Sequence, residues 1–171
     1  MVIQKKPKVT LKLKKGELIR RGNEKDILVI KPYLIESWVM HARHEPKLLD
    51  EKRMRESDIE KYYKDALKNK NSSFLIAEVN GEIAGFIRAD VQKIPSFFKE
   101  NKILYIDDVY VARKFRRRGI ARSLVFVVEN MAKRKNIKRL QARVYTFNKP
   151  MQNLLKSMGY TLPHATWDKL L

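Results

Sequence analysis

The 171-residue sequence contains no cysteine. Disulfide bonds, thiolate metal ligands and thiol nucleophiles are therefore excluded together. No apolar run approaches the roughly 18 residues that a transmembrane helix needs, and the basic N-terminal stretch lacks the apolar segment of a secretory signal. We therefore expect a cytoplasmic protein that is not associated with a membrane.

Acidic residues are also scarce, because 19 Asp and Glu stand against 38 Lys and Arg and give a formal net charge of +19. Such an excess attracts anionic ligands and speeds their encounter with the protein. The charge alone does not choose among nucleic acid, an acidic protein, a membrane surface and a nucleotide-type cofactor. The apolar fraction of 44% is typical of a globular protein, and the length suits one domain with a real core.

Residues 1–26 differ from the rest of the chain in composition, with nine Lys or Arg and three acidic residues. Within them Val9, Leu11 and Leu13 alternate with polar residues, which is the pattern of a short strand. We interpret 1–26 as a basic N-terminal extension that contains some strand, and 27–171 as one folded domain.

The remaining chain alternates strand and helix patterns. The apolar run at 27–31 predicts a buried strand that Pro32 ends, and apolar stripes predict helices near 34–49 and 59–67. Strands at 73–79 and 83–91 flank Asn80-Gly81, a strong hairpin signal. Further strands are expected at 103–111, 139–146 and 165–171, with helices at 120–132 and after Asn148, ending at Gly159. This order predicts a mixed α/β sheet with helices on both faces.

The stretch RKFRRRGIAR at 113–122 gathers six basic side chains around one glycine, between the strand at 103–111 and the following helix. A helix N-terminus offers unpaired N–H groups and a partial positive charge, so a tight loop ahead of it forms an anion site. Gly119 allows the backbone to approach a ligand closely, and arginine side chains suit phosphate oxygens. The position therefore indicates a phosphate-binding loop, with Arg113 and Lys114 more suited to a wider surface for an anionic partner.

Arg116, Gly119 and Ala121 match the loop motif Q/R-x-x-G-x-G/A of the GNAT superfamily of N-acetyltransferases. The chain resembles this family in four further stretches, in the family's order. They are ILVIKP at 27–32 for the first strand, FLIAEVNGEIAGFI at 74–87 for the hairpin of the second and third strands, YIDDVYV at 105–111 for the fourth strand, and Asn148 with LLKSMGY at 154–160 for the last helix motif.

The resemblance implies a mostly antiparallel mixed sheet whose fourth (103–111) and fifth (138–146) strands splay apart to hold acetyl-CoA. It places the CoA pyrophosphate on the loop N–H groups and the pantetheine arm against the backbone of the fourth strand. The residues that it assigns to acetyl-CoA are Val109, Tyr110, Val111, Arg116, Arg117, Arg118, Gly119, Ile120, Ala121, Arg122, Ser123 and Asn148. The implied reaction is direct acetyl transfer to an amine, with acetyl-CoA as the donor and no metal.

For the proton acceptor, the chain offers Asp107 and Asp108 in the strand at 103–111. Strand alternation places Tyr105 and Asp107 on one face and Asp108 on the other. Asp107 is the candidate base and Tyr105 a second candidate catalytic residue, although both aspartates could instead hold local geometry or attract a cation. The family's usual tyrosine in the last helix corresponds to Leu155, which cannot donate a proton. Tyr145, Ser157, Tyr160 or water remain as alternatives.

The acceptor is left open among a small-molecule amine, a protein N-terminus and a lysine. An alternative function is a basic module that binds nucleic acid or an acidic protein on the same scaffold with weak or lost activity. His41 and His44 lack a third metal ligand in the sequence and suit an exposed polar face. Trp38 with Phe97 and Phe98 suits either the substrate groove or the core. The oligomeric state stays open, a dimer included.

Overall fold

The computed structural model describes residues 10–13 and 15–169. The strands are β1 (Thr10–Lys12), β2 (Glu17–Arg21), β3 (Ser72–Val79), β4 (Glu82–Lys93), β5 (Lys102–Val111) and β6 (Leu140–Ala142). The helices are α1 (Glu24–His44), α2 (Glu51–Glu56), α3 (Ile59–Lys68), α4 (Ile120–Arg134) and α5 (Lys149–Ser157), with a short 3-10 turn at Arg113–Phe115. The six strands form one sheet in sequence order, antiparallel throughout except that β5 and β6 run parallel.

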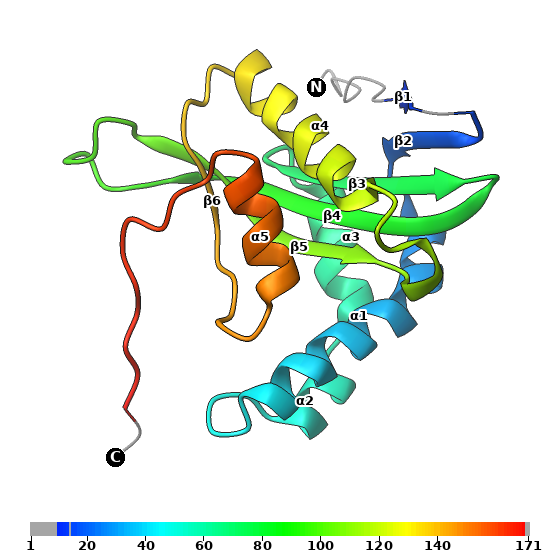
Figure 1. Ribbon diagram of the computed structural model, residues 1–171, viewed down its shortest axis with the longest axis horizontal. Helices are drawn as coiled ribbons and strands as arrows, with labels where there is room; N and C mark the ends of the chain where they lie inside the picture. Colours follow the sequence, from blue (N-terminus) through cyan, green and yellow to red (C-terminus); the bar gives the residue numbers. More distant parts are fainter. Residues whose placement is uncertain (1–9, 14, 170–171) are drawn as a thin grey trace.

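Helices cover both faces of this sheet, as expected. In Figure 1, α4 and α5 lie in front of the strands and α3 passes behind them. The rear layer is aromatic: Tyr63 of α3 packs edge-on against Phe74 and Phe86, and Tyr110 of β5 stacks between Phe86 and Tyr33 of α1. On the front, Leu124, Val125 and Val128 of α4 are completely buried against the sheet, so the core consists of two layers that the sheet separates.

The prediction of a strand at 27–31 is wrong, because these residues lie inside α1. A short apolar run cannot distinguish a buried strand from a buried helix segment. Ile27 and Ile30 are fully buried, whereas Leu28 is 63% exposed, which is a helical and not an alternating pattern. Pro32 removes one helix hydrogen bond, to the carbonyl of Leu28, where water can reach the turn.

The strand next to the hairpin is instead β2, which pairs with β3 along its whole length and buries Ile19 completely. The sheet and its core therefore extend to the N-terminal side of residue 27. The expected short strand around 9–13 is confirmed at Thr10–Lys12, while Val9 lies outside the described residues. The division of the chain into 1–26 and 27–171 stays a prediction.

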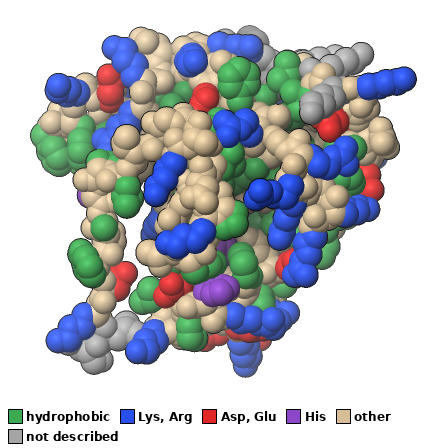
Figure 2. Space-filling view, viewed as in Figure 1, with side chains coloured by type: hydrophobic (Ala, Val, Ile, Leu, Met, Phe, Trp, Pro, Cys, Tyr) green, Lys and Arg blue, Asp and Glu red, His purple; other side chains and the backbone are tan. Residues whose placement is uncertain are grey.

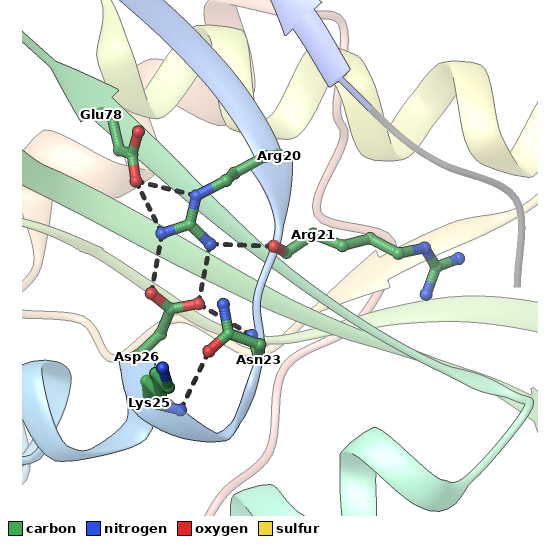
Figure 3. A network of polar contacts seen from close by, with 6 residues as sticks. All are labelled: Arg20, Arg21, Asn23, Lys25, Asp26 and Glu78. Carbon is green, nitrogen blue, oxygen red and sulfur yellow. Dashed lines mark hydrogen bonds and ion pairs between the residues drawn. The ribbon is translucent and has the colours of Figure 1, made fainter. Parts of the chain in front are cut away.

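A buried ion network fastens β2 to α1 and β3 (Figure 3). The Arg20 guanidinium donates to both oxygens of Asp26, each at 2.7 Å, and its Nε donates to Glu78 at 2.7 Å. Asp26 also accepts from the N–H of Asn23, whose side chain in turn caps the first turn of α1. One arginine thus joins three elements and fixes the start of α1.

The hairpin at Asn80-Gly81 is confirmed, with φ of 51° and 82° at these two residues. Two positive φ values in a two-residue turn match the twist of antiparallel strands. The helices expected near 59–67, 120–132 and after Asn148 are also confirmed as α3, α4 and α5. No helix in the described part of the chain combines the length and apolar character that a membrane crossing requires.

The fifth strand of the expected splayed pair is much shorter than the predicted range of 138–146. β6 contains only Leu140–Ala142, and it pairs with β5 from Leu104 to Ile106, after which the two segments separate. The expected strand at 165–171 is wrong for its described residues, since 160–169 contain no strand. Leu162 is 83% exposed and Trp167 is 94% exposed, so burial supplies no stabilisation for a strand there.

Candidate functional site

A cleft of about 1220 Å³ opens where β5 and β6 separate. Its walls come from the 32–44 part of α1, the end of β5, the β5–α4 loop and the whole length of α5 as far as Ser157. Lys and Arg side chains gather over the β5–α4 loop on the right half of Figure 2. A concave site with a cationic rim suits an elongated ligand that carries negative charge.

The β5–α4 loop has the backbone of an anion site. Arg117 and Gly119 both adopt positive φ, at 63° and 86°. Gly119 is the N-cap residue of α4, and among the described residues no side chain caps this helix. The Ser123 N–H donates to the Gly119 carbonyl at 3.0 Å, so by helix geometry the N–H groups of 120–122 lack a helical acceptor. Gly119, Ile120 and Ala121 line the cleft, so these N–H groups and the positive end of the helix dipole lie at its wall.

Glycine suits position 119 because of its backbone conformation. Its φ of 86° lies in the left-handed region that L side chains rarely adopt. A Cβ built there would meet nothing within 4 Å, so the backbone conformation, and not a steric contact within the protein, favours glycine at this position.

The basic residues of the loop have distinct partners. Arg116 donates through Nε to the Val111 carbonyl at 2.9 Å, and Arg122 donates to Ser157 of α5 at 2.6 Å. Arg118 faces Glu17 of β2 at 3.4 Å. The two basic residues that precede the motif are paired as well: Arg113 binds Glu36 at 2.8 Å, and Lys114 binds Glu82. The positive charges of Arg113 and Lys114 are thus partly neutralised within the protein.

The structure brings most of the predicted cofactor residues together. The cleft is lined by Val109, Tyr110, Val111, Arg116, Arg117, Gly119, Ile120, Ala121, Arg122 and Asn148. Arg118 and Ser123 lie outside this lining. Asn148 caps α5, because its side-chain oxygen accepts from the Met151 N–H at 3.2 Å, and its amide nitrogen is the donor that remains.

The two aspartates do not lie on opposite faces, so that prediction is wrong. The β4–β5 register shifts between Arg88↔Asp108 and Ala89↔Ile106, which leaves Asp107 as the extra residue of a β-bulge. Both carboxylates consequently reach the α1/α3 layer. Asp107 accepts from the Tyr62 hydroxyl, and Asp108 accepts from the Tyr63 hydroxyl at 2.9 Å.

The carboxylates differ in exposure and charge. The Asp107 side chain is 29% exposed and lies 3.8 Å from Nη1 of Arg88. Asp108 lies deeper, and Trp38 Nε1 approaches its second oxygen at 3.5 Å. Burial, reinforced by the neighbouring Asp107 charge, raises the pKa of Asp108 to about 6. Neither carboxylate belongs to the lining of the cleft, which begins one residue later at Val109.

Sequence reasoning missed the residues that surround these carboxylates. Arg88 stacks on the Tyr62 ring, with its guanidinium carbon 3.8 Å from the ring centroid, and binds Asp90 at 3.0 Å. Its position opposite Asp108 comes from the pairing of β4 with β5, and the bulge that sets this register has no sequence signal here. Tyr105 lies opposite Asp90 in the same ladder, and burial raises its pKa.

The candidate proton donors and His41 lie in different surroundings. Leu155 is buried, and of the alternative proton donors Ser157 lines the cleft and donates to the Leu154 carbonyl. Tyr145 packs against His41 and Phe147. The expectation of an exposed face is wrong for His41, which is half-buried and whose pKa is lowered by burial.

Trp38 and the phenylalanine pair lie in different clusters. Trp38 packs edge-on against Tyr62, near the aspartates. Phe97 and Phe98 pack against each other in the β4–β5 loop, next to Arg139. Only Trp38 is therefore close to the candidate acceptor region.

Comparison with known proteins agrees with this geometry. Residues 35–160 match the model of the Acetyltransferase (GNAT) family. An uncharacterized N-acetyltransferase of Methanocaldococcus jannaschii is 28% identical over 99 residues, which cover 58% of this chain and 43% of that protein. An N-alpha-acetyltransferase of Sulfurisphaera tokodaii is 25% identical over 107 residues, which cover 58% of this chain and 62% of that protein. The chain thus spans less than two thirds of either relative.

A solved structure shows the same fold. It is a predicted acetyltransferase from Clostridium acetobutylicum with acetyl-CoA, with a TM-score of 0.66, 21% identity, and coverage of 91% of this chain and 96% of that one. The likeness at this identity concerns the fold. The family match covers most of the chain, and the sheet, the splayed strands and the glycine loop agree with it. The chain belongs to the acetyltransferase (GNAT) family.

Proposed function

We propose that the protein is an acetyl-CoA-dependent N-acetyltransferase that moves an acetyl group directly to an amine. The observation that carries this proposal is the uncapped N-terminus of α4, with Gly119 at φ 86°, at the edge of the cleft between β5 and α5. The family membership and the Clostridium acetobutylicum protein with acetyl-CoA support the same donor.

The residues present fit the donor. The N–H groups of Ile120, Ala121 and Arg122 would hold the pyrophosphate, and Arg117 on the cleft wall would add charge. The backbone of β5 after Ile106 has no β6 partner, so Val109 and Val111 would offer their amide groups to the pantetheine arm. Asn148 would add its side-chain nitrogen. When bound, acetyl-CoA supplies the activated acetyl thioester.

Asp107 is the proposed base. Its side chain is partly exposed, and an acceptor ammonium would meet two adjacent carboxylates in a protein that is otherwise strongly basic. As a carboxylate, Asp107 would take the ammonium proton, directly or through a water molecule, before acetyl transfer. Tyr62 and Arg88 would hold Asp107 in place. Tyr105, whose raised pKa keeps its hydroxyl protonated, would orient the acceptor by donating a hydrogen bond.

The acceptor is an amine, and three sources remain: a small molecule, a protein N-terminus and a lysine side chain. The relative named an N-alpha-acetyltransferase makes a peptide α-amine the first one to test. Because Leu155 is apolar and buried, we expect solvent or Ser157 to protonate the leaving thiolate.

The test is acetyl-CoA binding by the full chain, measured as a rise in melting temperature and by calorimetric titration. Gly119→Ala should abolish saturable binding, because relief of the left-handed strain at φ 86° would displace the N–H groups that follow it. Gly81→Ala is the matched control: its φ is 82°, its Cβ also meets nothing within 4 Å, and it lies in the hairpin turn away from the cleft. Both variants should lose about 1 kcal/mol of stability from left-handed strain.

Only Gly119→Ala should lose the ligand. If acetyl-CoA does not stabilise the parent protein, or if both glycine variants bind it equally, the proposed donor site is wrong. A screen of peptide, lysine and small-molecule amines for release of free CoA then identifies the acceptor class.

A further inference from the structure

The surface formed by residues 93–102 and 133–139 has no role in the proposed reaction. It consists of the β4–β5 loop and the segment that leaves α4 and enters β6. The two parts are joined by the Lys138–Glu100 ion pair at 3.9 Å, and the hydrogen bond from the Leu104 N–H to the Arg139 carbonyl at 3.0 Å holds the second part to β5. We call it the loop-end surface. None of its residues lines the cleft.

Two aromatic side chains project from the loop-end surface. Phe97 is 81% exposed and Phe98 is 40% exposed, although burial is the favourable state for both. Their ring centroids lie 4.7 Å apart, and the Arg139 guanidinium carbon lies 4.9 Å from the Phe98 ring centroid. At the left of Figure 2, where Figure 1 shows the β4–β5 loop, apolar side chains stand out beside cationic ones. An exposed pair of rings with an adjacent guanidinium offers flat faces on which planar groups can stack.

The same surface carries strong positive charge. Its eight cations face a single acidic residue, Glu100, and they are Lys93, Lys99, Lys102, Lys133, Arg134, Lys135, Lys138 and Arg139. Lys133 and Arg134 lie in the last turn of α4, and cations there interact favourably with the negative end of the helix dipole. This interaction does not account for Lys93, Lys99 and Lys102, which are exposed in the β4–β5 loop and at the strand ends beside it.

We propose that the loop-end surface binds single-stranded RNA. The combination of exposed rings and dense cations fits a polyanion whose bases are unstacked, because phosphates pair with the lysines while bases stack on the rings. An acidic protein would satisfy the charge but leave the ring faces without planar partners. A duplex would likewise keep its bases within its own stack. The surface is separate from the acetyl-CoA cleft, so the two ligands bind at the same time.

The experiment measures binding of a fluorescein-labelled 20-nucleotide oligouridine by the full chain, through fluorescence anisotropy at several salt concentrations. The variant Phe97→Ala/Phe98→Ala should bind at least about tenfold more weakly, since one base stacked on an aromatic ring contributes roughly 5- to 150-fold. Phe126→Ala is the aromatic control, because Phe126 is 50% exposed on α4 and lies outside the loop-end surface. It should bind within about twofold of the parent protein.

A second pair of variants separates local contacts from net charge. Lys99→Glu and Lys47→Glu change the charge equally at exposed positions, but only Lys99 lies on the loop-end surface. Lys99→Glu should weaken binding and reduce the salt slope by about 0.7 for each phosphate that the protein no longer neutralises. Lys47→Glu should leave that slope unchanged, and saturating CoA should leave the RNA affinity unchanged.

Several results would overturn the proposal. They are absence of binding at ~0.1 M salt, equal weakening by the two lysine variants, displacement of RNA by CoA, and equal or tighter binding of a 20-base-pair duplex. Phenylalanine-dependent capture on anionic vesicles without RNA binding would assign the surface to a membrane instead. The melting temperature and far-UV circular dichroism of the phenylalanine variant serve as the folding control and keep this test independent of the proposed enzyme activity.

Discussion

Replacing Arg20 with methionine should lower the free energy of unfolding by about 3 kcal/mol. The substitution keeps an apolar stem of similar length and removes the guanidinium that joins Asp26 and Glu78. The Asp26 side chain is only 7% exposed and that of Glu78 is 16% exposed, so two carboxylates would remain close together with little water. Removing one partner of a buried ion pair costs about 3–5 kcal/mol.

The lower end of that range applies for two structural reasons. The Arg20 side chain is 26% exposed, so water can partly replace it. The Asn23 N–H continues to donate to Asp26 at 2.7 Å, so one oxygen keeps a partner. For a domain of this size, a loss of about 3 kcal/mol corresponds to a fall in melting temperature of roughly 6–12 °C.

Urea unfolding followed by circular dichroism measures the change, and the double variant Arg20→Met/Asp26→Asn tests its cause. The double variant should be more stable than Arg20→Met alone, because it leaves one unpaired carboxylate, that of Glu78, in place of two. Asparagine at position 26 still offers an oxygen to the Asn23 N–H. If Arg20→Met loses less than about 1 kcal/mol, or if Asp26→Asn gives no recovery, the network does not fasten β2 to α1 as argued.

Three further predictions concern the site. Asp107→Asn should lower kcat by about 10²-fold while acetyl-CoA affinity is unchanged, and an unchanged kcat would exclude Asp107 as the base. Because the pKa of Asp108 is raised to about 6 from its usual 3.8, the native state binds more protons there than the unfolded chain between these values. Stability of the parent protein relative to Asp108→Asn should therefore fall as pH rises through this window, by at most about 3 kcal/mol, and stay constant above it. A difference that rises with pH would contradict the raised pKa. Asn148→Ala should lose about 1 kcal/mol of stability with its cap, and Asn148→Asp should keep it, as urea titration of the two variants will show.

The sequence was sufficient for features that depend on local chemistry. Asn80-Gly81 defines its turn through two positive φ values, and Gly119 marks the β5–α4 loop through its place between a strand and a helix. Asn148 marks the start of α5 because its side chain caps the helix. Each feature is encoded within a few neighbouring residues.

The failures depend on contacts between distant residues. The run at 27–31 is equally apolar in either conformation, and its helical state is decided by packing of Ile27 and Ile30 and by the Arg20 network. The C-terminal pattern at 165–171 has strand character but finds no buried position among the described residues. The side of the sheet on which Asp107 and Asp108 lie depends on a β-bulge, and the pairing with β4 sets the position of that bulge.

The bulge at Asp107 also divides β5 into two halves of opposite phase. Before it, the even-numbered Leu104 and Ile106 share a face with Ala89; after it, the odd-numbered Val109 and Val111 share a face with Ile87 and Gly85. Deletion of Asp107 would remove the extra residue, so that Ile106 would stay opposite Ala89, Asp108 opposite Arg88, and Tyr110 in the Tyr33–Phe86 stack. The pairing of β4 with β5 therefore does not depend on Asp107, and the consequence of the extra residue is a second carboxylate on the α1/α3 side of the sheet, beside Tyr62 and Arg88.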